Sequence, residues 1–408
     1  MGSRSQRTAI ALVTSLFFLW ALAHNLNPIL IPHLRKALQL NDMRSALVDS
    51  AFFIAYFVMA LPAGAMMKRF GYRMGIVGGL LLFALGTFLF WPAATLRSYP
   101  FFLSALFIIA SGLTFLETAA NPYISILGDP ATAPRRLNFA QAFNGLGAAL
   151  AAWFGGRFVL SGRALTEEEL TAMTPGALDA YLTSEALAVR VPYMIIGLVV
   201  LFAAVLFLRT HLPEISGTDN GQQRDPRAWH RLKLGVVAQF FYVGAQVGVA
   251  SFFIRFAGQV AEIGEKDAAY LLSIGLLLFM AGRFIGTALM RWIAASTLLA
   301  ICALLNIALV AMAVLTDGYI AVGALLGAEL CMSIMFPTIF SLSIDGLGHD
   351  TKLGSSLLVM SIVGGAVVPP IMGAISDRHS LRFAYLAPLV CFVVVLLFAR
   401  VVRKPLHA

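Results

Sequence analysis

One carboxylate stands alone in a long apolar stretch of the chain. Between Phe101 and Leu127 the only charged residue is Glu117, which lies in the segment FLETAANPY and is followed by Asn121 and Pro122. An isolated ionised carboxylate in a low-dielectric medium is so unfavourable that it pairs, takes up a proton or faces water. Because burial favours the neutral form of a carboxyl group, this segment predicts a residue that binds and releases a proton.

Amide and phenol side chains recur at helical spacing in this and other apolar stretches. Glu117 and Asn121 are four residues apart, and Gln141 and Asn144 are three apart, so each pair shares one face of a helix. Amides beside aromatic rings suit a ligand rich in hydroxyl groups, such as a sugar. A hydrogen bond between neighbouring helices, at about 0.6–2 kcal/mol, explains any single amide equally well. The candidate ligand-binding residues are Trp20, Asn25, Asn27, Asn121, Asn138, Gln141, Asn144, Gln239, Tyr242 and Gln246.

The composition requires a membrane environment. The chain has 408 residues, of which 60% are hydrophobic and 12% are charged, whereas soluble domains are roughly 45–50% apolar and about 25% charged. The net charge of +9 is spread between apolar runs, so we expect no nucleic-acid partner. Cys302, Cys331 and Cys391 lie in separate apolar runs without metal-ligand spacing, and we interpret each as a packing residue.

Twelve stretches are long and apolar enough to cross a bilayer, which takes about 20 residues. A polar segment at 211–231 separates the first six of these stretches from the last six. The polar loop 161–189 is expected to hold one or two short helices. We therefore predict an all-α integral membrane protein with two pseudo-symmetric six-helix bundles, at 1–210 and 232–408, joined by a cytoplasmic linker at 211–231. The predicted spans are 8–34, 44–67, 74–95, 99–127, 136–160, 191–209, 232–261, 267–289, 293–315, 319–344, 353–375 and 383–402.

Loop charges predict the orientation of these spans. Basic residues gather in alternate loops, as in Lys68–Arg73 and the segment 209–233, and acidic residues favour the other side. By the positive-inside rule we expect both termini in the cytoplasm of a multi-pass plasma-membrane protein. Arg35 with Lys36, and Arg378 with Arg382, are exceptions on the outer side.

The two halves resemble each other weakly, as parallel repeats do. At the matching positions the second half lacks the carboxylate and the amides of the first, so we expect the polar chemistry to be concentrated in the first half. We also expect helix breaks at Pro28, Pro122, Pro337 and Pro369–Pro370. The repeat pairs Pro122 with Pro337, Glu117 with Met332, Asn121 with Phe336, Arg136 with Lys352 and Gln141 with Leu357.

Several segments resemble one family of transporters. FLETAANPY, RLNFAQAFNGLGA, QFFYVGAQ, FPTIFSLSIDGLG and GSSLLVMSIVGG are similar to the fucose–galactose–glucose symporter family of the major facilitator superfamily. The resemblance covers nearly the whole chain and implies the major facilitator fold, alternating access and import of a monosaccharide with a cation, with the proton favoured. It implies a monomer in the bacterial inner membrane that needs no cofactor. By this resemblance Glu117 serves proton coupling and sugar binding, and Asn25, Gln141 and Asn144 line the cavity.

One departure from the family concerns a second carboxylate. Fucose-type relatives carry an aspartate in the first span, where this chain has Pro28, and the second span here gains Asp49 in ALVDSAFF. Asp49 could therefore supply the missing carboxylate for ion coupling. Alternatively, it merely lies in the first turns of its helix, where negative charge is favourable. Both interpretations stay open.

Rival functions leave fewer traces in the sequence. Sodium is the rival ion because glucose-type relatives include sodium-coupled members, and Asp49 with Asn27 could contribute oxygen ligands. A transporter of another polar solute also fits the amides, whereas an exporter of apolar compounds fits them poorly. No catalytic triad, metal-ligand spacing or phosphate-binding loop appears in the sequence, so we do not expect an enzyme.

Overall fold

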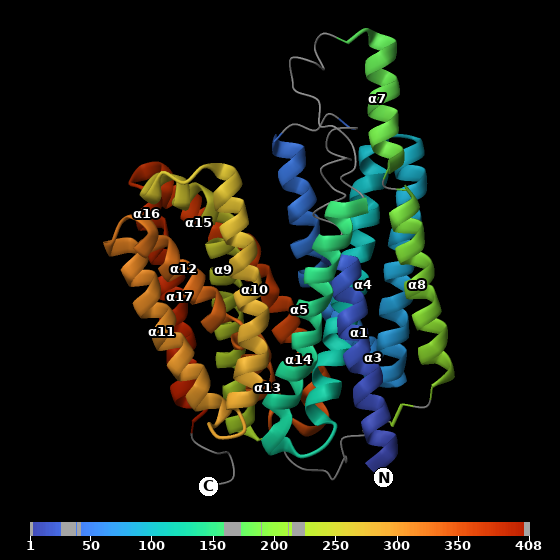
Figure 1. Cartoon of the computed structure of the whole chain (residues 1–408). Coiled ribbons are helices and arrows are strands. Elements are labelled where there is room, and N and C mark those ends of the chain that lie inside the picture. Colours follow the sequence, from blue (N-terminus) through green and yellow to red (C-terminus); the bar gives the residue numbers. More distant parts are fainter. Residues whose placement is uncertain are drawn as a thin grey trace.

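The computed structural model of the chain describes residues 3–25, 38, 42–158, 173–188, 190–210, 212–213 and 225–403, and every regular element in these ranges is helical (Figure 1). We call 3–213 the first half and 225–403 the second half. The helices are α1 (Ser3–Asn25), α3 (Asp42–Thr95), α4 (Tyr99–Ile126), α5 (Ala133–Phe158), α7 (Pro175–Ala188), α8 (Arg190–Arg209), α9 (Pro226–Ala261), α10 (Glu265–Leu289), α11 (Ala295–Leu315), α12 (Gly318–Met332), α13 (Met335–Ile344), α14 (Thr351–Met360), α15 (Gly364–Arg378), α16 (Leu381–Ala384) and α17 (Leu386–Val401).

The twelve predicted spans are all found in these helices. Helix α3 makes two passes that meet at Gly71, whose φ of 82° lies in the region that favours glycine. Span ten consists of α12 and α13, and span eleven of α14 and α15. The other passes are α1, α4, α5, α8, α9, α10, α11 and α17, so the prediction of an all-α fold with twelve membrane helices is confirmed.

Among the described residues, only one of the prolines expected to break a helix lies next to a break. Helix α4 continues through Pro122, and Pro369–Pro370 lie inside α15, so the expected breaks at these positions are wrong. Span ten is interrupted at Ser333–Ile334, one turn before Pro337, as expected for that proline, because Pro337 has no N–H to bond the Ser333 carbonyl oxygen. Span eleven is interrupted at the 3₁₀ turn Ser361–Val363. A proline removes one backbone hydrogen bond, and packing against neighbouring helices compensates for that loss in a membrane protein. Pro28 lies outside the described residues.

Helix α9 begins within the segment that the sequence assigns to the linker. The Asp225 carboxylate accepts a hydrogen bond of 2.8 Å from the backbone N–H of Arg227, and Pro226 occupies the first turn. This is a favourable helix start, because the cap satisfies a free N–H and proline has no N–H to satisfy. Residues 226–231 are therefore helical, and 214–224 lie outside the described residues.

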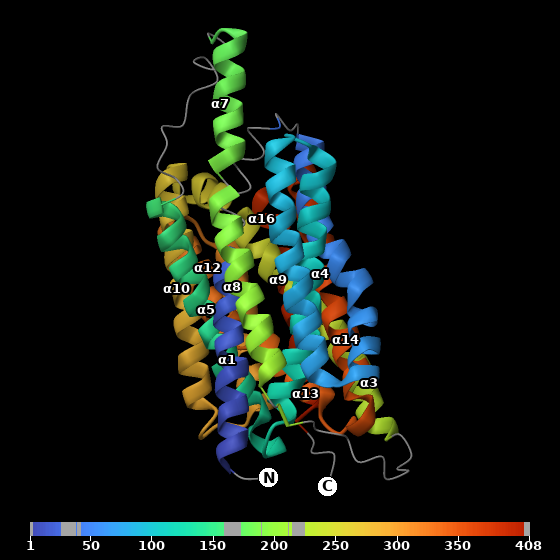
Figure 2. The same cartoon turned by 90° about the vertical axis from the view of Figure 1, so that its right-hand side faces the viewer.

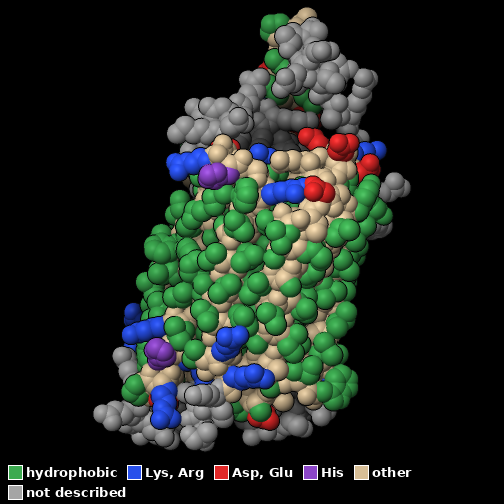
Figure 3. Space-filling model, turned by 90° about the vertical axis from the view of Figure 1, so that its left-hand side faces the viewer, with side chains coloured by type: hydrophobic (Ala, Val, Ile, Leu, Met, Phe, Trp, Pro, Cys, Tyr) green, Lys and Arg blue, Asp and Glu red, His purple; other side chains and the backbone are tan. Residues whose placement is uncertain are grey.

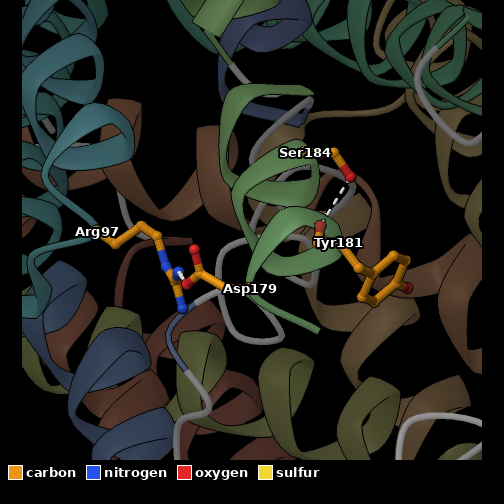
Figure 4. A network of polar contacts seen from close by, with 4 residues as sticks. All are labelled: Arg97, Asp179, Tyr181 and Ser184. Atoms are coloured by element: carbon orange, nitrogen blue, oxygen red, sulfur yellow. Dashed lines mark hydrogen bonds and ion pairs between the residues drawn. The ribbon is translucent and has the colours of Figure 1, made fainter. Parts of the chain in front are cut away.

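Helix α7 projects beyond the other helices at the end opposite the two termini (Figures 1 and 2). It confirms the expected helix within the loop 161–189, of which 161–172 lies outside the described residues. An ion pair of 2.5 Å between Arg97 and Asp179 ties α7 to the turn between α3 and α4 (Figure 4). Nearby, the Ser184 hydroxyl donates to the carbonyl oxygen of Tyr181 within α7.

The surface of the second half has the banding of a membrane protein. Figure 3 shows hydrophobic side chains over a broad middle band, with Lys, Arg, Asp, Glu and His near its two rims. Large apolar side chains such as Trp292, at 76% exposure, face outward. At one rim Arg382 pairs with Asp317, so one of the basic exceptions to the positive-inside pattern has its charge compensated. Nine helical runs in the described residues are long and apolar enough to cross a membrane, and one of them, Ala51–Thr95, contains both passes of α3. The remaining two passes are α1, with the shorter apolar stretch Ala9–Ala21, and α5.

The two halves meet at the end of the molecule that carries the termini. One buried apolar cluster lies entirely within 238–402, whereas the other joins residues of the first half to Leu232, Phe340, Ile344, Leu347 and Leu358. The Lys352 ammonium donates across the halves to the carbonyl oxygen of Met67, at 3.0 Å. Toward α7 the helices of the two halves diverge (Figure 1).

Candidate functional site

Glu117 lies on α4 and faces the second half. The Tyr56 hydroxyl, from the first pass of α3, donates to Glu117 Oε1 at 2.8 Å. Glu117 is half-buried, although Leu116 and Thr118 beside it are fully buried. Its carboxylate is also close enough to Arg283, on α10, for the two charges to act on each other. The carboxylate that stood alone in the sequence therefore has a phenol donor and a cation of the other half as neighbours.

A chain of polar contacts crosses between the halves one turn along α4. Gln141 Nε2 donates to Asn121 Oδ1 at 3.0 Å, which joins α5 to α4. Arg283 Nη1 donates to the Gln141 carbonyl oxygen at 2.8 Å and to Gln141 Oε1 at 3.4 Å. Arg283 Nε donates to the Ser333 carbonyl oxygen at 3.0 Å, at the break in span ten. This buried guanidinium thus connects the amides of the first half to a break in a helix of the second.

Asn138 joins the same two halves closer to the termini. Its Nδ2 donates to the Pro134 carbonyl oxygen at 2.9 Å and to Thr338 Oγ1, on α13, at 3.0 Å. Its Oδ1 is buried and has no partner among the described residues. The amide of Asn138 therefore bonds neighbouring helices, and its oxygen remains able to accept a donor.

The predicted residues of α1 lie among packed side chains. Trp20 is buried, with its ring 4.4 Å from that of Phe17. Asn25 Nδ2 donates to the carbonyl oxygen of Ala21 at 2.7 Å. Asn27 lies outside the described residues. Asp49 belongs to α3, about two turns after its first residue, and its side chain is not among those described.

The three predicted residues of α9 are arranged differently from one another. The Tyr242 hydroxyl donates to the carbonyl oxygen of Met332 at 2.9 Å. Gln239 is fully buried, and neither atom of its amide has a partner within the described part of the chain. Gln246 is half-buried, as is Asn144 on α5, and the described residues offer neither side chain a hydrogen bond. Three of the predicted amides are thus unsatisfied or open to a ligand.

Three polar residues that the sequence analysis did not select belong to this part of the molecule. Tyr56 and Arg283 contact the Glu117 region, and Glu329 on α12 is buried in the second half. The expectation that polar chemistry is concentrated in the first half is therefore wrong. The same signal that selected Glu117 was present, because Arg283 and Glu329 each stand alone among apolar residues, over 268–290 and 318–344.

Comparison with known proteins identifies the family. Residues 10–360 match the Major Facilitator Superfamily. The chain is 42% identical over 413 residues to the L-fucose-proton symporter of Escherichia coli, covering 98% of this chain and 94% of that protein. It is also 42% identical over 402 residues to a glucose/galactose transporter of Brucella abortus, covering 97% and 94%.

A solved structure supports the same assignment. The crystal structure of the major facilitator transporter FucP in the outward conformation superimposes with a TM-score of 0.92 at 41% sequence identity, covering 98% of this chain and 100% of that chain. The family match extends over both halves, from residue 10 to residue 360, and the relatives extend over nearly the whole chain. The chain therefore belongs to the Major Facilitator Superfamily and is a transporter rather than an enzyme.

Proposed function

We propose that this protein is a proton-coupled symporter that imports a monosaccharide of the fucose, galactose or glucose class by alternating access. The observation that carries the proposal is the position of Glu117, a carboxyl group between the two halves with Tyr56 and the buried Arg283 as neighbours. Relatives of equal identity are named for fucose and proton in one case, and for glucose and galactose in the other. These names support the sugar class and the proton.

The coupling follows from the charges around Glu117. An ionised Glu117 attracts Arg283, which also holds Gln141 and the break at Ser333. Protonation removes one charge of this pair, so the guanidinium is held by its carbonyl partners alone. Because a proton and a conformation that share an interaction affect each other reciprocally, the state of Glu117 biases the arrangement of the two halves.

The sugar site is proposed to lie beside this carboxyl group. Asn144 and Gln246 have amides without partners in the described structure, and Asn121 Nδ2 is buried and unsatisfied. A sugar hydroxyl can both donate to and accept from an amide, so a bound sugar satisfies these groups. Gln141, Asn138, Gln239 and Tyr242 complete the proposed polar surface, and Trp20 and Asn25 on the first span close it. Asn27 stays a candidate from the sequence alone.

Alternating access requires that the contacts between the halves break on one side and form on the other. Lys352 to Met67 and Asn138 to Thr338 are contacts of this kind at the end with the termini. The similar FucP structure has the outward conformation. We place both termini, and the contacts near them, on the cytoplasmic side of a bacterial inner membrane, with bundles at 1–210 and 232–408 that move as units in a monomer.

The proton is preferred over sodium as the coupling ion. A relative at 42% identity is named as a proton symporter, whereas sodium needs several converging oxygens. The described residues around Glu117 offer one carboxylate, one phenol and a guanidinium, and a guanidinium repels a metal ion. Asp49 is kept as a candidate second carboxylate for proton movement.

Uptake into proteoliposomes tests this proposal. The purified protein is reconstituted and supplied with labelled L-fucose, D-galactose and D-glucose, under a proton gradient or a sodium gradient alone. We expect accumulation of at least one sugar with the proton gradient only. Glu265→Gln is the matched control for Glu117→Gln, because it makes the same change at an exposed carboxylate in the first turn of α10. We expect it to leave uptake unchanged. Uptake that ignores both gradients contradicts the proposal.

A further inference from the structure

A second carboxyl group is buried in the second half of the membrane region. Glu329 lies on α12, four residues before the break at Ser333, and is 3% exposed. It is the only charged residue from Gly318 to Ile344. Ionisable residues inside the membrane are unfavourable and generally functional. The network around Glu117 does not include it.

The residues facing Glu329 come from the helices packed against α12. From α10, Gly275 lies opposite, where an added Cβ would be 3.4 Å from Glu329 Cγ. From α9 and the start of α17, the hydroxyl groups of Tyr242 and Tyr385 lie within electrostatic range. These hydroxyls donate to the carbonyl oxygens of Met332, at 2.9 Å, and Val249, at 3.4 Å. They are therefore engaged elsewhere.

Helix α11 contributes to a different face of α12. Its Cys302 thiol contacts Cys331, two residues after Glu329 and therefore on nearly the opposite side of the helix. The described part of the chain contains no hydrogen-bond donor and no cation bonded to the Glu329 carboxyl group. An ionised carboxylate in such a place would lack any compensation for its lost hydration, a cost that a bound proton removes.

We propose that Glu329 is a second proton-binding site, separate from Glu117, whose proton is released during the transport cycle. The inference rests on the proposed function of proton-coupled uptake, and it adds a second ion to each sugar. Glu329 is neutral in the present arrangement. We expect it to lose its proton when movement of α12 brings a donor or more water to it.

The contacts of Arg283 supply a route for this movement. Arg283 holds the Gln141 side of the sugar site and the Ser333 carbonyl oxygen, one helical turn from Glu329. A sugar that shifts Gln141, whose main-chain and side-chain oxygens both accept from Arg283, would therefore change the bond that fixes the end of α12. Tyr242, which bonds Met332 on the same turn as Ser333, responds to the same change. Binding in the first half is thus transmitted to the proton site in the second.

The coupling ratio in proteoliposomes tests the proposal. The membrane voltage and proton gradient that just balance a given sugar gradient give the number of protons moved per sugar. We expect the wild-type protein to move two protons per sugar and Glu329→Gln to move one, with sugar uptake still driven by protons. Glu329→Asp, which keeps a carboxyl group, is expected to restore the wild-type ratio. Equal ratios in wild type and Glu329→Gln overturn the proposal.

A second measurement does not depend on transport. Infrared difference spectra, recorded as sugar is added, report the C=O band of a protonated carboxyl group. We expect a band that Glu117→Gln retains and that Glu329→Asp shifts, and its absence overturns the proposal even if Glu329→Gln does not fold. If wild-type protein couples no sugar to protons, the proposed function fails. A Glu329 band seen in that case still shows a second proton-binding carboxyl group.

Discussion

The two matching spans of the repeat, α4 and α12–α13, each carry one carboxyl group, but its surroundings differ between the two spans. Helix α4 runs unbroken past Glu117, which has a phenol donor at 2.8 Å and a guanidinium nearby. Span ten breaks at Ser333–Ile334, and its Glu329 has no such partners among the described residues. The partners of Glu117 stabilise its ionised form, whereas the described surroundings of Glu329 favour its neutral form.

On the proposals made above, one scaffold holds two kinds of ion site. A carboxylate with a donor and a cation tolerates ionisation inside a protein, whereas one without them stays protonated until its surroundings change. Arg283 lies between the two sites and bonds to both Gln141 and Ser333. Substitutions at Glu117, Arg283 and their neighbours allow the contributions of the two proposed sites to be measured separately.

The largest effect is expected from Glu117→Gln. The amide cannot release a proton, so sugar binding should lose the part of its pH dependence that Glu117 supplies. Coupling of this kind is typically about 5–150-fold in affinity. The measurement is sugar affinity and proton-driven accumulation across a pH series. A pH dependence of sugar affinity that is unchanged in this variant contradicts the role of Glu117.

Arg283→Met should rank next, because it affects both sites. It leaves the carbonyl oxygens of Gln141 and Ser333 without their donor, which costs about 1–3 kcal/mol for each buried group. We expect a lower melting temperature in detergent and loss of coupled uptake, with Arg283→Lys intermediate. A variant with the wild-type melting temperature and uptake would contradict the proposed link that Arg283 makes between Gln141 and Ser333.

Gly64→Ala should shift the balance between the conformations. An added Cβ at Gly64 would lie 2.0 Å from Ser356 Oγ, so α3 and α14 could no longer approach at the end with the termini. Overpacking of this kind costs about 1–3 kcal/mol. We expect greater labelling of cysteines introduced at this end. Gly176→Ala is the control, since nothing lies within 4 Å of its added Cβ.

The smallest effects distinguish the two tyrosines. Tyr56→Phe and Tyr242→Phe each remove one hydrogen bond, to Glu117 Oε1 and to the Met332 carbonyl oxygen, at about 0.5–1.5 kcal/mol. Loss of a donor disfavours an ionised carboxylate, so Tyr56→Phe should extend uptake toward higher pH. Tyr242→Phe should leave the pH profile of the Glu117 step unchanged. Identical pH profiles for the two variants would contradict this comparison.

Part of the site could be predicted because apolar runs make single polar residues conspicuous. Glu117, Asn121 and Gln141 were selected in this way, and the structure joins Asn121 to Gln141. Arg283 and Glu329 are likewise single charged residues in apolar runs. The repeat alignment, however, pairs Glu117 with Met332, which led to the prediction that the polar residues are concentrated in the first half. Tyr56 could not be selected, because a tyrosine in an apolar span is usually a packing residue.

Two residues that match in the repeat alignment make different contacts in the structure. Arg136 and Lys352 correspond in the alignment and both donate to the carbonyl oxygens of another helix end. Arg136 Nη2 bonds Ser125 of the preceding helix at 2.8 Å, whereas Lys352 reaches Met67 in the other half. The same position therefore stabilises one half in the first repeat and joins the two halves in the second.

The sequence by itself determined the membrane environment, the twelve spans and the buried charges, because these depend on local composition and length. Only the tertiary structure decided which charges meet. Whether Glu117 has a donor, whether Glu329 has none, and whether Arg283 bonds both halves depend on helices distant in the chain. The break of span eleven at Ser361–Val363, with Pro369–Pro370 inside the continuous helix α15, likewise reflects packing between helices. Local sequence patterns determine which helix faces carry polar side chains. Contacts between helices determine which hydrogen bonds and ion pairs those side chains make.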